Sequence, residues 1–204
     1  MTVVVEEQLR RKHPPEAIAL MERAHQAAPT NLALTARLGT VYVQTGAPQK
    51  ALDLAKAAQP ADGAPNAQLL LLTANAQLAL KQPDQARKVY LQLIKDWPQS
   101  KHVPSAYLAF GELFFQEAEA DPSKLTLAEQ AYKEVIKYPS TDFLGYAHYK
   151  LGYVAWNKGD FAAALGEMKK TIEIAAQNPQ APGAKSTSES ARRDLVTVYG
   201  IAGD

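Results

Sequence analysis

The sequence predicts an all-α fold in which pairs of antiparallel helices repeat along the chain. The clearest pair lies in residues 145–171, where two helical patterns flank a turn at Gly159 and Asp160. The second pattern places a small residue, Ala164, one helical turn before the large Met168. Alanines in the same place recur at intervals of 34, 35, 42 and 36 residues: Ala17, Ala51, Ala86, Ala128 and Ala164. Five successive matches indicate an internal repeat, whereas a single match would carry little weight.

Local residue chemistry explains why residues 145–171 should form a helical hairpin. Gly152 has no Cβ, so a second helix can approach the first one closely there. Gly159 tolerates a positive φ at the end of the first helix, and Asp160 can cap the second. Two apolar stripes lie side by side on the first helix: Leu151, Gly152 and Ala155 in one, and Tyr146, Tyr149, Tyr153 and Trp156 in the other.

This hairpin resembles the tetratricopeptide repeat, a 34-residue helix pair with the pattern W-x2-L-G-x2-Y…A-x3-F…P. His148 and Ala155 stand in place of the family's tryptophan and tyrosine. The resemblance implies a right-handed superhelical solenoid of antiparallel helix hairpins, with about eleven helices. The residues that carry the match are Leu151, Gly152, Gly159, Ala164 and Met168.

The same pattern divides residues 1–204 into a single solenoid of five hairpins and a lone last helix. In the first hairpin, residues 6–12 should end one helix, and Pro15 suits the first turn of the next. We expect hairpins at approximately 1–30, 31–64, 65–99, 100–140 and 141–180, and the lone helix at 181–204. The matching residues in the first four hairpins are Ala17, Met21, Ala24 and Pro29; Leu38, Gly39, Tyr42, Gly46, Ala51 and Ala58; Ala86, Tyr90 and Pro98; and Tyr107, Phe110, Gly111, Phe114, Ala128 and Tyr132. In the third hairpin Ala74 replaces the family's glycine.

Loops and helix starts complete the prediction. Residues 60–65 form a Pro- and Gly-containing loop. Capping boxes are expected at two helix starts: Thr126 with Glu129, and Ser186 with Glu189. In the last helix the repeat offsets hold Leu195, Tyr199 and Gly203. A helix of this kind normally pairs with a second one, so we expect the chain to be a fragment of a longer protein.

Composition argues against several classes of function. Of the 204 residues 47% are hydrophobic and 21% charged, which suits a folded domain with a buried core. A net charge of +1 argues against nucleic-acid binding. The sequence contains no run of about 18 apolar residues, which is the length a membrane-spanning helix needs.

The residues of catalytic and metal sites are also missing or scattered. The chain has no cysteine, and no glycine-rich motif that would cradle a phosphate. Its histidines stand in no metal-binding spacing: His13, His25, His102 and His148. Neighbouring acids suit solvated helix faces better than acid–base pairs: Glu6 with Glu7, and Glu117 with Glu119. We therefore expect no metal, no cofactor and no enzymatic activity.

The resemblance also implies a binding face. In the family, the first helices of the hairpins line a concave face that takes protein or peptide partners. The family's clamp for chaperone C-termini needs basic residues on this face, which the matching positions lack. The implied partner-binding residues are Tyr146, Tyr149, Tyr153, Trp156 and Asn157 in the fifth hairpin; Leu108, Glu112 and Phe115 in the fourth; and Leu71 and Asn75 in the third.

Two interpretations of the tyrosines and the tryptophan of the fifth hairpin stay open. They can anchor a partner, because such rings give a large contact area at small entropic cost. Alternatively, they pack against the next helix, around Leu195 and Val196. The aromatic residues of second helices are expected in the core between repeats: Tyr90, Trp97 and Tyr132.

These observations predict a non-catalytic scaffold or adaptor that binds a peptide or partner protein within a multiprotein assembly. Residues 95–175 resemble, in style, tetratricopeptide proteins of the Gram-negative envelope, namely the outer-membrane assembly lipoprotein, the Tol-Pal coordinator and gliding-motility repeat proteins. That resemblance favours the bacterial periplasm or cell envelope over the cytoplasm, although the family's lipobox cysteine is missing. Two alternatives are a repeat protein that stacks into homo-oligomers and a regulatory domain of a larger enzyme.

Overall fold

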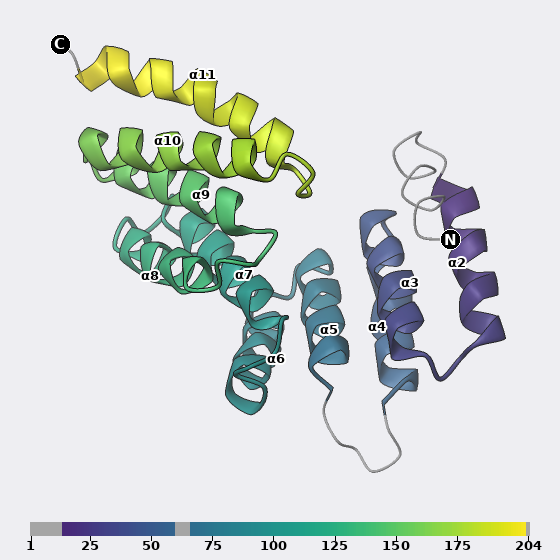
Figure 1. The fold of residues 1–204 in the computed structure, drawn as a ribbon. Coiled ribbons are helices and arrows are strands. Elements are labelled where there is room, and N and C mark those ends of the chain that lie inside the picture. Colours follow the sequence, from purple (N-terminus) through teal and green to yellow (C-terminus); the bar gives the residue numbers. More distant parts are fainter. Residues whose placement is uncertain (1–13, 60–65, 203–204) are drawn as a thin grey trace. The chain divides into compact units, whose positions relative to one another are not determined.

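The computed structural model describes residues 14–59 and 66–202, and within these ranges it consists of helices and turns, without a strand (Figure 1). The all-α class and the paired hairpins are confirmed. The described helices number ten: α2 (Pro14–Ala27), α3 (Leu32–Gln44), α4 (Pro48–Ala57), α5 (Ala67–Ala79), α6 (Pro83–Asp96), α7 (Val103–Glu117), α8 (Lys124–Ile136), α9 (Leu144–Asn157), α10 (Phe161–Gln177) and α11 (Ala184–Ala202). The predicted helix end at 6–12, the loop at 60–65, His13, Glu6, Glu7 and Gly203 lie outside the described residues.

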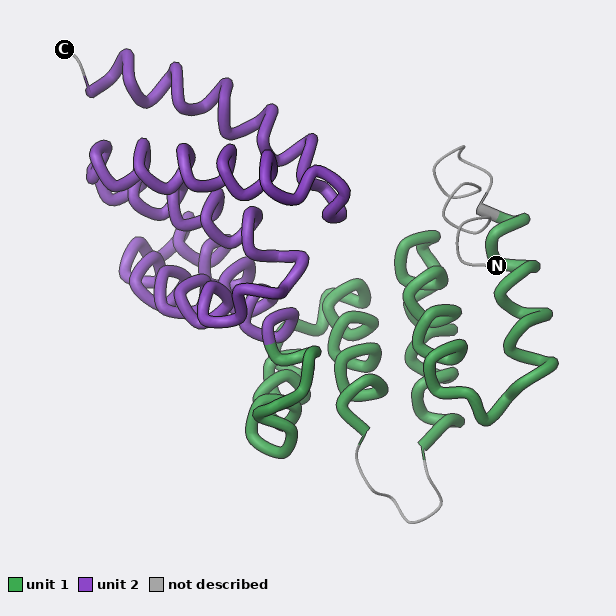
Figure 2. The backbone as a smooth tube through the Cα atoms, viewed as in Figure 1, with its two compact units in different colours: residues 1–103 green, residues 104–204 purple. Residues whose placement is uncertain are grey.

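The chain divides into two compact units, residues 1–103 and residues 104–204 (Figure 2). Each unit has its own apolar clusters and is described by itself. A single continuous solenoid over residues 1–204 stays a prediction.

The first unit contains the hairpins α3/α4 and α5/α6, with α2 packed on α3. Small and large side chains interlock in its core, because alanines let neighbouring helices approach and leucines fill the space between them. Tyr42 of α3 is buried, and its hydroxyl donates a 2.7 Å hydrogen bond to Glu22 of α2. The buried members of the core are Ala17, Met21, Leu38, Val41, Tyr42, Ala51, Leu52, Ala55, Leu72 and Ala76.

The second unit contains α7 to α11. One apolar cluster joins α7, α8 and α9 around Tyr132, and another joins α9, α10 and α11 around Met168. Helix α11 packs on α10 and also contacts α9. The repeat alanines Ala128 and Ala164 are both fully buried in these clusters, as their recurrence predicts.

Three turns between paired helices share a left-handed residue. Gly46 has φ 81°, Gly159 has φ 78°, and Lys81 has φ 61° at the matching place of the third hairpin. The prediction for Gly159 is confirmed. Asp160 caps α10, because its side chain accepts a 3.0 Å hydrogen bond from the backbone N–H of Ala163.

Gly152 brings α9 and α10 together as predicted. A Cβ at this position would lie 3.2 Å from Cγ of Met168 and 3.4 Å from the carbonyl oxygen of Ala164. Gly111 is tighter still, because a Cβ there would lie 2.3 Å from the Tyr132 ring. Both glycines therefore act by letting a neighbouring side chain occupy the space of a missing Cβ.

Both predicted capping boxes are wrong. Helix α8 begins at Lys124, so Thr126 lies inside it. The turn before α8 is closed instead by Asp121, which accepts hydrogen bonds from the N–H and the hydroxyl of Ser123. Helix α11 begins at Ala184, so Ser186 lies in its first turn and donates a hydrogen bond to the carbonyl of Gly183.

The core prediction for the aromatic residues of second helices holds for two of three. Tyr90 and Tyr132 are fully buried. Trp97 is 42% exposed, so its assignment to the core is wrong. It follows the last residue of α6 at the helix C-terminus, where the chain turns away from the hairpin.

Candidate partner-binding surface

Four rings form a continuous row along α9: Tyr146, Tyr149, Tyr153 and Trp156, here called the aromatic row. Consecutive ring centroids lie 6.4, 5.0 and 5.7 Å apart. Phe115 of α7 meets Tyr153 edge-on at 6.5 Å. All five rings are half-buried, so each keeps an accessible edge. Ring pairs at these distances attract one another, which favours this arrangement of the row.

The middle of the row is tied to α11. The hydroxyls of Tyr149 and Tyr153 donate hydrogen bonds of 2.7 and 2.9 Å to the same oxygen, Oδ2 of Asp194. Tyr149, Tyr153 and Trp156 also pack with Leu195 in the cluster around Met168. One side of the row thus contacts the next helix at Leu195, as one of the two interpretations expects. The same interpretation is wrong for Val196, which is 71% exposed.

A charged network lies beside the row. Lys150 of α9 contacts Oε2 of Glu112 on α7 at 3.1 Å, and its Nζ lies 4.3 Å from the centre of the Phe115 ring. The other oxygen of Glu112, Oε1, accepts a 2.8 Å hydrogen bond from the buried Tyr132 of α8. The carboxylate and the ammonium therefore neutralise each other within the protein, and the neighbouring rings present little net charge.

The other predicted partner-binding residues fall in different surroundings. Leu108 packs into the α7–α9 core, and the exposed Asn157 donates a hydrogen bond to the carbonyl of Tyr153. Leu71 and Asn75 belong to the first unit, where Leu71 is half-buried and Asn75 accepts a 2.6 Å hydrogen bond from Tyr90. The structure thus brings together Phe115, Glu112 and the aromatic row in the second unit.

Burial and carboxylates keep the phenols of the row neutral. Burial, and then the charge and hydrogen bond of Glu112, raise the pKa of Tyr146 to about 12. Burial also raises the pKa of Tyr149 and of Tyr153, with Asp194 acting in the same direction on both. These hydroxyls serve as hydrogen-bond donors near neutral pH, and none is poised as a nucleophile.

Sequence reasoning missed Asp194 and Lys150. Asp194 lies 45 and 41 residues from the two tyrosines that it accepts from, and no local pattern links positions so far apart. Lys150 sits among the tyrosines in the sequence, and its charge could have been matched to the predicted Glu112. That pairing follows from the way α7 and α9 pack, which the repeat pattern does not specify.

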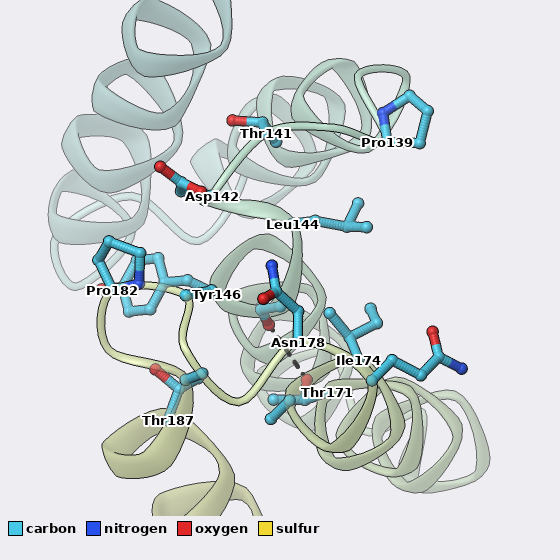
Figure 3. Close-up of a pocket in the computed structure, with 15 residues that line it drawn as sticks. Pro139, Thr141, Asp142, Leu144, Tyr146, Thr171, Ile174, Asn178, Pro182 and Thr187 are labelled. Atoms are coloured by element: carbon cyan, nitrogen blue, oxygen red, sulfur yellow. Dashed lines mark hydrogen bonds between the residues drawn. The ribbon is translucent and has the colours of Figure 1, made fainter.

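A pocket of about 150 Å³ opens near the start of α9 (Figure 3). Tyr146, the first ring of the row, lines it together with Leu144 and Ile174. Two lining residues are joined by a hydrogen bond of 3.3 Å, which the hydroxyl of Thr171 donates to the carbonyl of Gly145. Its lining combines apolar side chains with hydroxyl and amide groups and the carboxylate of Asp142. A pocket of this size suits one amino-acid side chain better than a cofactor.

Within the described residues, no group of three or more histidine, aspartate or glutamate side chains could hold a metal ion. In the same part of the chain, no helix has the length and apolar character needed to cross a membrane. His148 lies 2.6 Å from Glu167, so its ring nitrogen is engaged in an ion pair or hydrogen bond between α9 and α10.

Comparison with known families settles the nature of the repeats. Tetratricopeptide repeat models match residues 8–71, 68–100 and 118–180. The chain is a tetratricopeptide repeat protein. Members of this family generally mediate protein–protein interactions and are typically non-catalytic. No curated protein matches the chain.

Solved structures of other tetratricopeptide repeat proteins share this fold. The thermophilic protein TTC0263 from Thermus thermophilus is 18% identical, with a TM-score of 0.67, and the match covers 92% of this chain and 95% of that one. MamA is also 18% identical, with a TM-score of 0.56 and coverage of 87% and 97%. The C-terminal part of a repeat protein from Cytophaga hutchinsonii is 13% identical, with a TM-score of 0.58 and coverage of 100% and 81%. Identities this low show the fold alone.

Proposed function

We propose that this tetratricopeptide repeat protein is a non-catalytic adaptor that anchors an extended or helical peptide on the aromatic row and Phe115. The observation that carries the proposal is the row itself, in which adjoining rings contact one another, two of them donate hydrogen bonds to Asp194 of α11, and all remain partly exposed. Rigid tyrosine and tryptophan side chains lose little entropy on binding, which is why they often dominate interface energies.

The chemistry of the row indicates the kind of ligand. The phenols are neutral, and Glu112 and Lys150 are paired with each other, so the ligand should contribute apolar and hydrogen-bonding side chains rather than net charge. The pocket beside Tyr146 would accept one side chain of the peptide. Affinity should therefore change little with ionic strength.

The choice of variants follows from the contacts of each ring. Tyr149 and Tyr153 donate hydrogen bonds to Asp194 of α11. Replacing either by alanine would therefore remove both part of the binding surface and a hydrogen bond between α9 and α11. Tyr146 lies at one end of the row, outside the cluster that contains Leu195, so Tyr146→Ala separates binding from stability best. Trp156 packs in that cluster, so Trp156→Ala is interpreted together with its thermal unfolding. Leu127, on α8 and 37% exposed, supplies a matched control.

The test begins with a library of displayed random peptides, from which binders to the whole protein are selected. Binding of the synthesised peptides is then measured by fluorescence anisotropy, with thermal unfolding followed in parallel. Tyr146→Ala and Trp156→Ala should each weaken binding by about 1–2 kcal/mol, while Leu127→Ser leaves it unchanged. Selected peptides that bind all variants equally would show that the row is not the binding surface.

The prediction of a compartment rests on sequence resemblance alone. The matches reported above identify the repeat and no compartment, so a cell-envelope assembly stays a proposal. Self-association is the alternative function. Light scattering across a wide concentration range tests it, and a constant monomer mass would exclude it.

A further inference from the structure

Asp194 determines where the hydroxyl hydrogens at the centre of the aromatic row point. The hydroxyls of Tyr149 and Tyr153 lie 2.7 and 2.9 Å from Oδ2 of Asp194. A neutral phenol has one hydrogen and an ionised carboxylate has none, so each tyrosine donates its only hydrogen to Asp194. The two phenol oxygens are also 3.4 Å apart, but this longer contact is weaker than a bond to a charged acceptor.

With both hydrogens donated to Asp194, the polar atoms at this place can only accept hydrogen bonds. Each phenol oxygen keeps lone pairs, and Oδ1 of Asp194 belongs to a carboxylate that can accept several hydrogen bonds. Tyr149, Tyr153 and Asp194 are all half-buried, so part of each remains accessible. A ligand that covers them must therefore supply hydrogen-bond donors, because acceptors left without a partner on burial cost free energy.

The local charges favour a neutral donor over a cation. The guanidinium of Arg193, next to Asp194 in the sequence, donates a 3.1 Å hydrogen bond to the hydroxyl of Ser190. Burial is the main cause that raises the pKa of Tyr153, and its hydrogen bond with Tyr149 lowers it. The charges of Asp194 and Arg193 then act on the pKa of this phenol in opposite directions. A positive charge thus partly offsets the carboxylate here, which weakens the attraction for a second cation.

The rings around these oxygens fit a flat side chain. Tyr149 and Tyr153 meet edge to face, with centroids 5.0 Å apart, and the Trp156 ring lies 5.7 Å from that of Tyr153. Rings arranged in this way present faces and edges that attract a further aromatic ring. Among amino-acid side chains, the indole of tryptophan combines a flat apolar body with a neutral N–H that donates and does not accept.

We propose that the centre of the aromatic row binds an indole side chain of the peptide and accepts the hydrogen bond of its N–H. This inference rests on the proposed function, because it concerns the same surface, and it adds the ligand side chain that this surface selects. Asp194 is the specificity-determining residue, because it takes up both phenol hydrogens and leaves acceptors for the ligand. A ring of the same shape without the N–H would leave these acceptors unpaired, and sites of this kind discriminate against such analogues.

The test uses two probes of nearly identical shape. They are N-acetyltryptophanamide and its 3-benzothienylalanine analogue, in which sulfur replaces the indole N–H. Dissociation constants for the whole protein are measured by NMR titration, from the chemical shifts of the backbone amides of α9 and α11. N-acetyltryptophanamide should shift these amides and bind about fivefold to tenfold more tightly than the analogue.

Variants of Asp194 should remove most of this preference. Asp194→Leu removes the carboxylate and releases the two phenol hydrogens. Asp194→Asn has almost the same shape and adds N–H donors to the acceptor cluster, so it provides the test if Asp194→Leu does not fold. Glu189→Leu, at an exposed acidic position of the same helix, is the matched control and should keep the full preference.

Three results would overturn the proposal: no amide shifts with N-acetyltryptophanamide, equal affinity of the two probes, or an undiminished preference in a folded Asp194 variant. Tighter binding of N-acetyllysinamide than of N-acetyltryptophanamide would refute the choice of a neutral donor. Failure of the proposed function gives a different result. Selected peptides that ignore the row refute that function, whereas peptides that use the row while the probes bind equally refute only the indole preference.

Discussion

Tyr132, fully buried in α8, donates a 2.8 Å hydrogen bond from its hydroxyl to Oε1 of Glu112 on α7. The third hairpin contains the same relationship, in which the buried Tyr90 of α6 donates to Asn75 of α5 at 2.6 Å. Both acceptors occupy a position that the repeat pattern assigns to the binding face. Part of that face thus supplies hydrogen-bond acceptors for the hydroxyls of buried tyrosines.

Removing the hydroxyl of Tyr132 should destabilise the protein more than the matched change at Tyr90. Tyr132→Phe takes a donor from a carboxylate, and such hydrogen bonds contribute about 1.5–3 kcal/mol. Tyr90→Phe takes a donor from a neutral amide and should cost about 0.5–1.5 kcal/mol. Urea unfolding of both variants measures the difference, and equal losses would contradict the role given to Glu112.

Gly111→Ala should destabilise the protein, although alanine normally stabilises a helix relative to glycine. The new Cβ would meet the Tyr132 ring at 2.3 Å, and this ring is held by its burial and by Glu112. Overpacking of this kind costs about 1–3 kcal/mol. Gly166→Ala on α10 is the control, because nothing lies within 4 Å of its added Cβ. It should stabilise the helix by about 0.5–1 kcal/mol, and thermal unfolding compares the two.

Gly152→Leu tests the approach of α10 to α9. The longer side chain would enter the space of Met168 and the Ala164 carbonyl, at a cost of roughly 1–3 kcal/mol. The measurement is the melting midpoint by circular dichroism. An unchanged midpoint would mean that the two helices are not as close in solution.

Lys81→Gly should stabilise the first unit. Lys81 has φ 61° in the turn between α5 and α6, where the second and fifth hairpins have glycine. A left-handed backbone costs a non-glycine residue roughly 1 kcal/mol, which glycine would recover in part. Lys88→Gly, at an exposed position inside α6, should instead cost about 1 kcal/mol. Chemical denaturation that ranks the two variants in the reverse order would refute the strain at this turn.

Stability should depend on the ionisation of Glu167 in acid. Burial opposes its charge, but hydrogen bonds from His148 and Lys170, with their charges, hold the pKa of this carboxyl below its ordinary value. A carboxyl with a lowered pKa stabilises the folded state above its unfolded pKa of about 4.3 and loses that contribution as pH falls through the folded value. Glu167→Gln should therefore flatten the loss of unfolding free energy between neutral pH and about pH 3, and an unaltered slope would count against the pair.

The repeated hairpins could be read from the sequence because their causes are local. Ala164 recurs with its equivalents at every hairpin, Gly159 marks a turn that needs a positive φ, and Asp160 caps the helix that follows. Each signal depends on the residue and its neighbours within about one turn. The two predicted capping boxes were wrong because α8 and α11 begin at Lys124 and Ala184, two residues before Thr126 and Ser186.

The surroundings of the aromatic row depend on packing between helices distant in the sequence. The spacing of Tyr149 and Tyr153 places them on one face of α9, but it does not reveal that Asp194 accepts both hydroxyls or that Lys150 neutralises Glu112. Those contacts form because α7, α9 and α11 meet in space, with hydrogen-bonded partners 41 and 45 residues apart. The exposure of Val196 likewise follows from which neighbours cover α11. A periodic pattern specifies which residues share a helix face, whereas burial and pairing depend on what the fold places against that face.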